Sequence, residues 1–271
     1  MNYVIGGNGQ IGSEIINQLN IPKRNIIERH QYETWWDSRN LKRISSFLEE
    51  NVTEDATIFL AAGITDPNVD PIHLKRMNID LPINLVKVAQ NLNIKICTFG
   101  TIQEEFKTRN NYLDSKRAMI EVLAGEIDRG YHLHLRLHTV YGARKPKYHM
   151  FLSKLSQAIT SKTPFRMSSG LQLREFHHVT DDVRAIIAVN SSQVTGIEEI
   201  NSGKEFRLRD FAAAILENYS LEHLLELNVF KDPVHENYKI RFPINRLTEK
   251  INFRDPVSGF IKHHDEINPD L

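Results

Sequence analysis

A tyrosine and a lysine four residues apart could exchange a proton with a bound substrate. Tyr112 and Lys116 lie in a segment whose apolar residues recur at helical spacing, so the two side chains share one helix face. A phenol is a poor acid–base group near neutral pH, and a neighbouring ammonium lowers its pKa. The spacing therefore indicates an acid–base pair, although a surface tyrosine above a solvated lysine gives the same pattern.

Three glycines spaced three residues apart could form a turn that binds a pyrophosphate. Gly6, Gly9 and Gly12 lie between the apolar run of residues 3–5 and an amphipathic segment. A pyrophosphate must approach bare backbone N–H groups at a helix N-terminus, where a Cβ would be in the way. A tight turn without a ligand is the alternative, and the position between strand and helix favours binding. The expected cofactor contacts are Gly6, Gly9, Gln10, Ile11 and Gly12.

A hydroxyl follows another predicted strand, where Gly100 and Thr101 come after the apolar run of residues 94–99. The carboxyl ends of the strands line the ligand crevice of a doubly wound sheet. The Thr101 hydroxyl could therefore hydrogen-bond a carbonyl or alcohol oxygen of a substrate. A threonine that only caps a helix or stabilises a turn is the alternative.

The elements that must position these residues alternate between strands and helices, as is typical of an α/β fold with a parallel sheet. The apolar runs are continuous, which suits strands covered by helices on both faces. Right-handed crossovers then favour a Rossmann-type doubly wound sheet. We predict strands at 3–5, 25–28, 57–62, 94–99, 133–141 and 197–200, and helices at 11–19, 41–50, 83–92, 112–127, 150–160, 179–190 and 208–219.

The apolar pattern loosens after about residue 142, which divides the chain of 271 residues unevenly. We predict a dinucleotide-binding domain over 1–143, to which 178–202 return. The segments 144–177 and 203–271 are expected to form a small substrate-binding lid. A chain of this length can bury a core that needs no disulfide or structural metal.

The composition argues against several classes of protein. Lys and Arg number 34, and Asp and Glu also number 34, so there is no excess of positive charge for non-specific nucleic-acid binding. No apolar run approaches the roughly 18 residues of a membrane-spanning helix, and the N-terminus has no signal-peptide pattern. A single cysteine, Cys97, weakly favours a reducing compartment. We expect a cytoplasmic protein without nucleic-acid or membrane partners.

The glycine turn, the threonine and the Tyr-x-x-x-Lys pair occur in the order found in the extended short-chain dehydrogenase/reductase family, and the chain resembles that family. Its members include nucleotide-sugar epimerases, dehydratases and reductases. The resemblance covers residues 1 to about 215. Further similar segments are Leu60-Ala61-Ala62-Gly63, Met77-Asn78-Ile79, Arg136 to Gly142, Arg174 to Val179, and Asn201-Ser202-Gly203.

The resemblance implies an NAD(P)-dependent enzyme that acts on a nucleotide-activated sugar, and a homodimer. Tyr112 would exchange a proton with a sugar hydroxyl or ketone, and Thr101 would hold the same oxygen. Lys116 would hydrogen-bond the nicotinamide ribose and lower the pKa of Tyr112. Arg174 would contact the diphosphate, because a guanidinium fork suits two phosphate oxygens. The remaining implied contacts are Ala61, Ala62, Gly63 and Asn78 to the cofactor, and Gln103 and Thr139 to the substrate.

Three departures from the family bear on the reaction. The Thr-Asp-Glu signature of the 4,6-dehydratases reads Thr101-Ile102-Gln103 here, so the acid and base for water elimination are absent, and Glu104 is close but out of register. Only ten residues separate Thr101 from Tyr112, and Ala143 replaces the usual proline. We expect reduction of a keto sugar first and epimerisation through a transient ketone second. A non-catalytic NAD(P)-sensing regulator is the third alternative.

The choice of cofactor depends on the residue that ends the second strand. An acidic residue there accepts from the ribose 2′-OH of NAD, and a basic one suits the 2′-phosphate of NADP. The sequence offers Glu28, Arg29 and His30 in succession, and two basic residues give a slight preference for NADP. Trp35 and Trp36, followed by Asp37 as a further cofactor contact, are expected either beside the adenine or in the core.

Three histidines at even spacing, His132, His134 and His138, would share one face of the strand predicted at 133–141. Such a face could bind zinc. No cysteine or carboxylate cluster completes a ligand set, so no metal site is expected.

Overall fold

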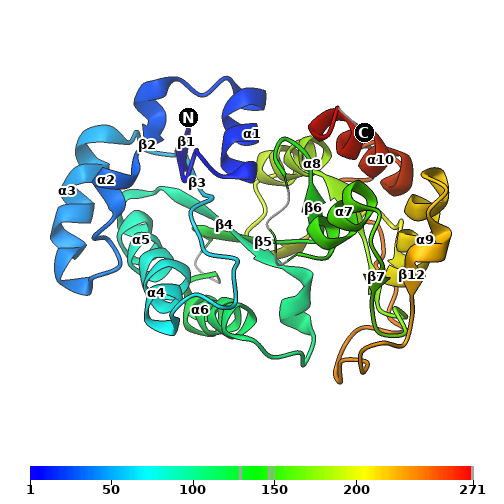
Figure 1. The fold of residues 1–271 in the computed structure, drawn as a ribbon. Helices are drawn as coiled ribbons and strands as arrows, with labels where there is room; N and C mark the ends of the chain where they lie inside the picture. Colours follow the sequence, from blue (N-terminus) through cyan, green and yellow to red (C-terminus); the bar gives the residue numbers. More distant parts are fainter. Residues whose placement is uncertain (128–129, 146–147, 149, 270–271) are drawn as a thin grey trace. The chain divides into compact units, whose positions relative to one another are not determined.

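The computed structural model describes residues 1–127, 130–145, 148 and 150–269. Contacts between residues divide the chain into two compact units (Figure 1). The first unit comprises Met1–Glu105, Arg109–Leu137 and Val183–Glu199. The second comprises Phe106–Thr108, His138–Asp182 and Ile200–Leu271. Among the helices of the described residues, none is long and apolar enough to cross a membrane.

The first unit is built on a six-stranded sheet in which every pair of neighbouring strands is parallel. The strand order is β10-β5-β4-β3-β1-β2. This order confirms the predicted Rossmann-type α/β fold. The strands are β1 (Asn2–Ile5), β2 (Ile26–Ile27), β3 (Thr57–Leu60), β4 (Lys95–Thr101), β5 (His132–Leu137) and β10 (Gly196–Glu199).

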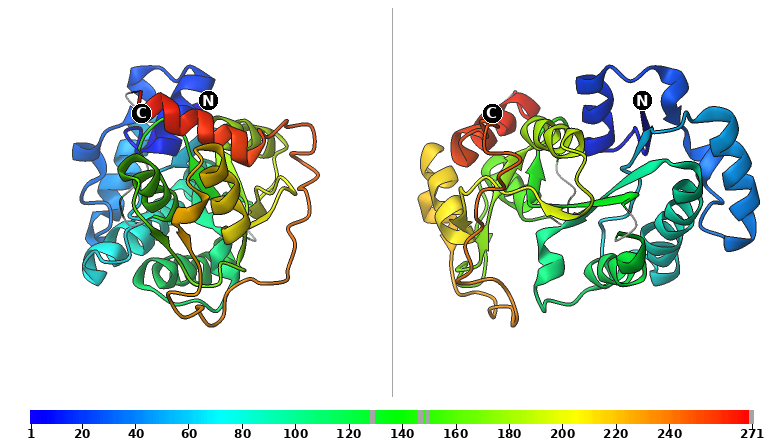
Figure 2. Two further views of the ribbon diagram at one scale, coloured as in Figure 1. Left: turned by 45° about the vertical axis from the view of Figure 1, so that its right-hand side comes forward. Right: turned by 180° about the vertical axis from the view of Figure 1, so that it is seen from behind.

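Helices pack on the sheet of the first unit, and α6 lies beside the continuous helical run that contains α4 and α5 (Figure 1 and Figure 2). The side chain of Asp70 caps α4 by accepting a hydrogen bond from the backbone N–H of Ile72. Pro71 occupies the first helical position, where a missing N–H removes no hydrogen bond from the helix. The helices are α1 (Gln10–Leu19), α2 (Arg29–Tyr32), α3 (Leu41–Asn51), α4 (Pro71–Lys75), α5 (Leu81–Ala89), α6 (Asn111–Ile127) and the later part of α8 (Val179–Ser191). A π-helical turn, η3 (Arg76–Asp80), joins α4 to α5.

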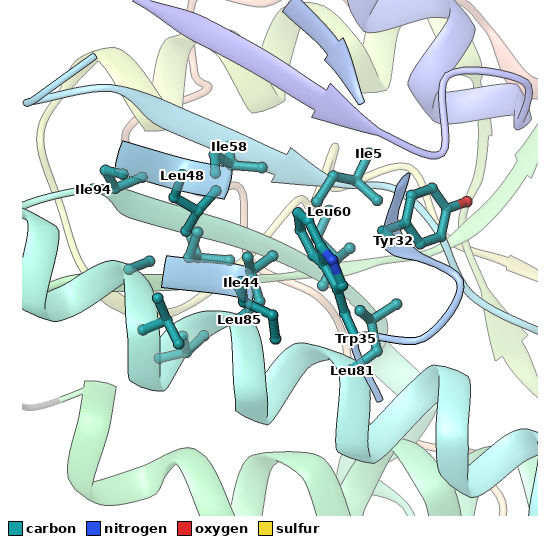
Figure 3. Packing of buried hydrophobic residues seen from close by; sticks show 14 of the residues in the cluster. Ile5, Tyr32, Trp35, Ile44, Leu48, Ile58, Leu60, Leu81, Leu85 and Ile94 are labelled. Carbon is teal, nitrogen blue, oxygen red and sulfur yellow. The ribbon is translucent and has the colours of Figure 1, made fainter. Parts of the chain in front are cut away.

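The core of the first unit fills the space between the sheet and α3 and α5 (Figure 3). Ile44 and Leu48 of α3 and Ile58 of β3 are fully buried in it. Trp35 is also fully buried, and its ring meets Phe47 edge-on at 5.2 Å between centroids. Of the two alternatives for Trp35, the structure therefore shows core packing, which is where a large aromatic ring removes the most apolar area from water.

In its described residues, the second unit has three two-stranded sheets and three α-helices of its own around an aromatic core. The rings of Phe176 and Phe211 stack at 3.8 Å between centroids, and Phe260 packs against Phe211. The strands pair as β6 (Thr139–Tyr141) with β9 (Phe176–His178), β7 (Phe165–Arg166) with β12 (Leu225–Glu226), and β8 (Leu173–Arg174) with β11 (Phe206–Arg207). The helices are α7 (Phe151–Ser161), α9 (Leu208–Asn218) and α10 (Pro256–Ile267).

The strand predicted at 133–141 is two strands in two sheets. β5 ends at Leu137 beside β4, and β6 begins at Thr139 beside β9, so His138 lies at the break and belongs to the second unit. The prediction of one strand was wrong because an apolar run does not reveal a change of pairing partner. The sequence prediction also omitted α10, which Asp255 caps by accepting from the Ser258 backbone.

Candidate active site

The glycine turn between β1 and α1 leaves backbone exposed where a side chain could not fit. Gly6 has φ +87°, and a Cβ there would clash with the backbone nitrogen of Ala62. A Cβ on Gly12 would clash with the carbonyl oxygen of Gly6, so this glycine permits α1 to pack closely on β1. Gly9 is the N-cap of α1, and its N–H donates to the Gly6 carbonyl at 2.9 Å. These features fit the close approach of a cofactor pyrophosphate.

A cleft of about 960 Å³ opens at the carboxyl ends of β1, β2 and β3. Of the predicted cofactor contacts, it is lined by Gly6, Gly9, Glu28, Arg29, Ala61, Ala62 and Gly63. The lining residues that the sequence analysis did not identify include Asn8, Lys23, His73 and Met77. Gln10, Ile11 and Gly12 lie in the first turn of α1, behind the glycine loop that forms the cleft wall.

Glu28 follows β2 directly, which resolves the register that the sequence left open. β2 ends at Ile27, Glu28 is the N-cap of α2, and Arg29 is the first residue of that helix. The backbone N–H of Glu28 donates to Gln31 Oε1 at 2.7 Å in a capping box. Its carboxylate also lies 3.5 Å from Nδ1 of His30, at the surface of the cleft. The acidic residue thus occupies the strand end.

Asp37 lies outside the residues that line the cleft. Its carboxylate caps the short helix Ser38–Asn40 and pairs with Arg39, with 2.6 Å between Oδ2 and Nη2. Trp36 is partly buried, and the guanidinium of Arg76 lies 4.2 Å from its ring centroid. The role of Asp37 in cofactor binding stays a prediction.

Tyr112 and Lys116 lie one turn apart in the first half of α6. Lys116 is buried, and its Nζ donates to the carbonyl oxygen of Phe99 at 2.7 Å, so the ammonium reaches the carboxyl end of β4. A Cβ on Gly63 would lie 3.8 Å from the same Nζ. Gly63 also lines the cleft, so the Lys116 ammonium lies at the edge of the cleft.

The pKa of Tyr112 depends on its burial and on the charge of Glu104. Burial raises the pKa of Tyr112, and the negative charge of Glu104 raises it further. Burial lowers the pKa of Lys116, and the Glu104 carboxylate opposes that change. The expectation that Lys116 lowers the pKa of Tyr112 stays a prediction.

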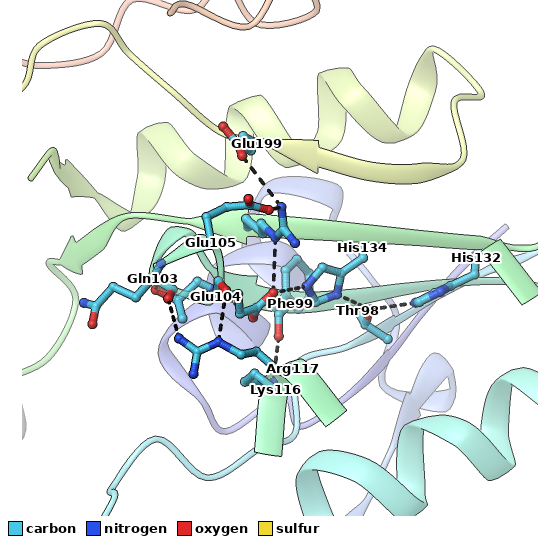
Figure 4. Close-up of polar contacts among 12 residues, drawn as sticks. Thr98, Phe99, Gln103, Glu104, Glu105, Lys116, Arg117, His132, His134 and Glu199 are labelled. Atoms are coloured by element: carbon cyan, nitrogen blue, oxygen red, sulfur yellow. Dashed lines mark hydrogen bonds and ion pairs between the residues drawn. The ribbon is translucent and has the colours of Figure 1, made fainter. Parts of the chain in front are cut away.

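Thr101 is the last residue of β4, and its backbone and side chain are both used in the turn that follows. Its N–H donates to Glu104 Oε1 at 2.9 Å, and its hydroxyl accepts from the Gln103 N–H at 3.4 Å. Figure 4 shows that the Gln103 side chain points away from Glu104 and from the polar contacts of the Glu104 carboxylate. Arg117 of α6 donates to the carbonyls of Gln103 and Glu104 and fixes this turn against the helix.

Glu104 is a buried carboxylate that the sequence placed out of register. Its Oε2 lies 3.1 Å from His134 Nε2 and accepts from Arg136 Nε at 3.2 Å (Figure 4). Burial acts to raise its pKa, but His134, the Thr101 N–H and the charge of Lys116 together lower the pKa of Glu104 to about 2. The sequence signal for this group was the glutamate itself, three residues after the strand end.

Asn78 positions the loop after β3, and its amide oxygen and nitrogen both form hydrogen bonds there. Its Oδ1 accepts from the Ile64 N–H at 2.9 Å, and its Nδ2 donates to the Ile64 carbonyl at 2.8 Å and to Ser115 Oγ at 3.0 Å. The side chain is buried. Asn78 thus ties Gly63 and Ile64 to α6 beside Lys116, and direct cofactor contact stays a prediction.

Arg174, the predicted diphosphate contact, is a buried residue of the second unit. Its Nη2 forms an ion pair with Glu236 Oε2, and its Nη1 donates to the Leu173 carbonyl at 2.8 Å. The guanidinium also lies 5.7 Å from the ring centroid of Phe106. A diphosphate at Arg174 would therefore compete with a carboxylate.

Thr139 lies in the second unit together with two segments that resemble the family, Arg174 to Val179 and Asn201-Ser202-Gly203. The N–H of Thr139 donates to the Glu175 carbonyl at 3.2 Å. The Glu175 carboxylate accepts from the N–H groups of Ser202 and Gly203 at 2.7 and 2.8 Å, and from His177 at 2.8 Å. The predicted contact of Thr139 with substrate stays a prediction.

His132 and His134 share one face of β5, whereas His138 does not join them. Thr98 Oγ1 lies 2.7 Å from His132 Nε2 and 2.8 Å from His134 Nδ1. His138 Nε2 instead lies 2.8 Å from Asn201 Oδ1, in the second unit. In the described part of the chain, no group of three or more His, Cys, Asp or Glu residues could hold a metal ion.

Comparison with solved structures shows the same fold over nearly the whole chain. A dTDP-glucose 4,6-dehydratase from Bacillus anthracis in complex with NAD is similar at TM-score 0.75 and 15% identity, over 100% of this chain and 97% of that one. A UDP-glucuronic acid 4-epimerase from Bacillus cereus, in complex with UDP-glucuronic acid and NAD, is similar at TM-score 0.77 and 14% identity, over 100% of both chains.

A third structure, a dTDP-4-dehydrorhamnose reductase from Clostridium acetobutylicum, is similar at TM-score 0.70 and 15% identity, over 99% of this chain and 100% of that one. At these identities the likeness shows the fold alone. The model of the NAD dependent epimerase/dehydratase family matches residues 2–203, which is most of the chain and includes the glycine turn, Tyr112 and Lys116. The protein therefore belongs to the NAD dependent epimerase/dehydratase family.

Proposed function

We propose that the protein reduces a keto group of a nucleotide-activated sugar with a nicotinamide cofactor, and that Tyr112 donates the proton. One observation carries the proposal: the buried Lys116 ammonium and the cofactor cleft meet at Gly63, one helical turn from Tyr112. A cofactor that enters the cleft would thus reach the acid–base pair.

The residues of the cleft fit a dinucleotide. The bare backbone at Gly6 and Gly9 and the N-terminus of α1 would hold the pyrophosphate, because exposed N–H groups and the helix dipole favour an anion. Lys116, by the resemblance to the family, would hydrogen-bond the nicotinamide ribose. A bound reduced nicotinamide supplies the hydride, and the protein orients it and provides the proton.

A protonated Tyr112 would suit the reduction of a keto sugar. A phenol whose pKa is raised is protonated at neutral pH and can give its proton to a carbonyl oxygen. Epimerisation begins with the removal of a proton from a hydroxyl, for which a phenolate is needed. The absence of the Thr-Asp-Glu signature at residues 101–103 also argues against dehydration.

The preferred cofactor is NAD in this proposal. The Glu28 carboxylate at the end of β2 can accept from a ribose 2′-OH and would repel a 2′-phosphate. Four solved structures of similar fold are complexes with NAD by their descriptions. The slight preference for NADP drawn from Arg29 and His30 has no support from these comparisons.

The relatives and Arg174 support a nucleotide-sugar as the substrate class. Structures of similar fold are complexes with UDP-glucose or UDP-glucuronic acid, and one is a dTDP-4-dehydrorhamnose reductase. Arg174 would bind the diphosphate after its release from Glu236. Thr101 would hydrogen-bond the keto oxygen that receives the proton.

The test is incubation with 4-deuterated NADH and UDP- or dTDP-linked 4-keto-6-deoxyglucose, followed by NMR of the sugar. The proposal predicts one NADH consumed for each sugar reduced, with deuterium at the reduced carbon. Interconversion of UDP-glucose and UDP-galactose without net consumption of cofactor would favour epimerisation. Binding of NADH without turnover of any of these sugars would favour the regulator.

A further inference from the structure

The imidazole of His177 lies between two buried carboxylates in the second unit. Its Nδ1 is 2.8 Å from Asp182 Oδ1, and its Nε2 is 2.8 Å from Glu175 Oε2. Glu175 and Asp182 are fully buried, and His177 is 2% exposed. The reaction proposed above uses none of these three side chains. Buried ionisable groups in such direct contact need an explanation beyond packing.

The backbone around Glu175 is shaped to hold an ionised carboxylate. Its Oε1 accepts from the Gly203 N–H at 2.8 Å, and its Oε2 accepts from the Ser202 N–H at 2.7 Å and from the Ser202 hydroxyl at 2.9 Å. Gly203 has φ +71°, which glycine adopts without strain, so two successive N–H groups converge on the carboxylate. Burial acts to raise the pKa of Glu175, but His177 and the Ser202 N–H are among the groups that lower it.

The ionised Glu175 fixes one end of the His177 ring. A carboxylate only accepts, so His177 carries a proton on Nε2. Its Nδ1 either donates to an ionised Asp182 or accepts from a protonated one, and burial raises the pKa of Asp182. Asp182 lies in the first turn of α8, where the helix dipole favours an ionised carboxylate. Burial acts to lower the pKa of His177, but the two carboxylates raise it to about 9, so the ring is charged at neutral pH.

We propose that the charged ring of His177 is a clamp that holds the carboxylates of Glu175 and Asp182 together and thereby positions Thr139 and Arg174 for the substrate. The inference rests on the proposed function, because Thr139 and Arg174 are the residues of the second unit that we expect to bind the nucleotide-sugar. It goes beyond that function in naming His177 as the positioning residue for both of them.

Glu175 is joined to both expected substrate contacts through its backbone. Arg174 precedes it in the chain and ends β8, and the N–H of Thr139 donates to the Glu175 carbonyl at 3.2 Å. Thr139 also lies opposite Phe176 where β6 pairs with β9. A displacement of Glu175 would therefore move Thr139 and Arg174 together.

Three ends of the segments that form the second unit lie in or next to the clamp. The segment His138–Asp182 begins and ends there, and the segment Ile200–Leu271 begins there. His138 Nε2 lies 2.8 Å from Asn201 Oδ1 and 3.8 Å from Glu175 Oε2. The clamp thus holds the ends of both segments close to the residue that carries Thr139 and Arg174.

The charged and titratable groups on the surrounding segments leave the two carboxylates in control of the His177 ring. The ring of His138 lies 5.3 Å away between centroids, and burial lowers the pKa of His138 to about 4, so that ring is neutral. The ring of Phe253 lies 4.7 Å away. The other charged groups of these segments have partners of their own: Asp181 with Arg254 at 3.5 Å, Arg174 with Glu236, and Lys204 with the Phe253 carbonyl at 2.8 Å.

The 15N spectrum of the His177 ring in the parent protein tests the proposal directly. Side-chain 15N signals are assigned through their correlations to the His177 backbone and followed as the pH rises from neutral. We expect both ring nitrogens to carry protons at neutral pH and the charge to be lost only near pH 9. A ring with one protonated nitrogen at neutral pH has its second proton on Asp182, and this result would overturn the proposal.

Asp182→Asn removes one of the two carboxylates and keeps the size of the side chain. The pKa of His177 should then fall by about one to three units, because an opposite charge in direct contact is lost. The matched control is Asp181→Asn, which removes a carboxylate from the same helical turn that contacts Arg254. Equal shifts of the His177 pKa in the two variants, or none in Asp182→Asn, would contradict the clamp.

The positioning of Thr139 and Arg174 has a readout that needs no ligand. In Asp182→Asn, the backbone amide signals of Thr139 and Arg174 should shift with pH at the same midpoint as the His177 ring. Amide signals that stay in place while the ring of His177 loses its charge would show that the clamp does not act on these residues.

Binding of UDP-glucose separates positioning from a merely structural role. The parent protein should bind it equally well at about pH 6 and pH 8, because His177 is charged at both. Asp182→Asn should bind like the parent protein at the lower pH and roughly fivefold or more weakly at the higher pH. A structural defect alone would weaken binding equally at both, and this result would contradict the proposal. If the parent protein binds neither UDP-glucose nor dTDP-glucose, the proposed substrate class fails, and the NMR titrations still decide whether His177 is the clamp.

Discussion

The carboxylate of Glu236 and the guanidinium of Arg174 form a buried ion pair in the second unit. Thr108 donates to the other carboxylate oxygen at 3.1 Å, so both oxygens of Glu236 are engaged. A carboxylate and a phosphate offer a guanidinium the same pair of acceptor oxygens. Glu236 is thus paired with the guanidinium of Arg174, which we expect to bind the diphosphate of the substrate.

Replacing Glu236 with Gln should increase the affinity for UDP or dTDP by roughly tenfold, or about 1.4 kcal/mol. Removal of the charge leaves Arg174 buried without an ionic partner, which the diphosphate then supplies. The free energy of unfolding without ligand should fall for the same reason. Isothermal titration calorimetry measures the affinity. The control Glu226→Gln removes the exposed pair with Arg166 and should change neither quantity. Weaker binding by Glu236→Gln would contradict this account.

Gly6→Ala should destabilise the protein by roughly 2–4 kcal/mol and abolish cofactor binding. The positive φ and the clash with the Ala62 backbone both act against a side chain there. Gly125→Ala in α6 is the matched control, because a Cβ there meets nothing within 4 Å. It should be neutral or stabilise by up to about 1 kcal/mol. Denaturant unfolding and quenching of protein fluorescence by NADH report the two effects. A Gly6→Ala protein that binds NADH normally would disprove the assigned turn.

Asn78→Ala should lower the free energy of unfolding by about 2–3 kcal/mol and reduce kcat. The change leaves the Ile64 N–H and carbonyl and the Ser115 hydroxyl without their buried partner, and it frees the loop that carries Gly63. Asn91→Ala removes one exposed hydrogen bond to the Lys87 carbonyl and serves as the control. If both variants unfold at the same denaturant concentration as the parent protein, the positioning role of Asn78 is excluded.

The buried histidine His132 should make the protein less stable in mild acid. Burial lowers its pKa in the folded protein to about 3, from the ordinary value of 6.5. The unfolded chain therefore takes up a proton below pH 6.5 that the folded protein rejects, so stability falls as the pH falls from 6.5 toward 3.

In His132→Gln this loss should be smaller by about 2 kcal/mol between pH 6.5 and 4.5. Glu104→Gln should leave the slope in that range nearly unchanged. The pKa of Glu104 is lowered to about 2 in the folded protein. Its contribution to the free energy of unfolding is therefore present above the ordinary pKa of 4.5 and disappears as the pH falls toward 2. Urea unfolding at a series of pH values measures both slopes. Identical slopes in His132→Gln and the parent protein would refute this interpretation.

The sequence predicted the sheet, the glycine turn and the helix that carries Tyr112 and Lys116, because each depends on local pattern. Gly6, Gly9 and Gly12 are read from their spacing, and the shared helix face of Tyr112 and Lys116 follows from helical periodicity. The strand ends then place Thr101 near them, since the carboxyl ends of parallel strands meet at one edge.

Features that depend on distant partners could not be predicted in this way. The run of residues 133–141 gives no sign that its pairing changes at His138, because periodicity does not name a strand's neighbour. Glu104 seemed out of register because a short turn, held by Arg117, directs its side chain back under β4. The even spacing of His132 and His134 was recognised, but their partner Thr98 lies on another strand.

The most direct measurement of the central claim compares Tyr112→Phe with the parent protein in the reduction of UDP- or dTDP-linked 4-keto-6-deoxyglucose by NADH. Loss of the proton donor should lower kcat by roughly 10²–10⁴-fold and leave KM nearly unchanged, because the phenyl ring keeps its place in α6. The binding of NADH should also be retained. A Tyr112→Phe protein that reduces the sugar at the parent rate would contradict the account.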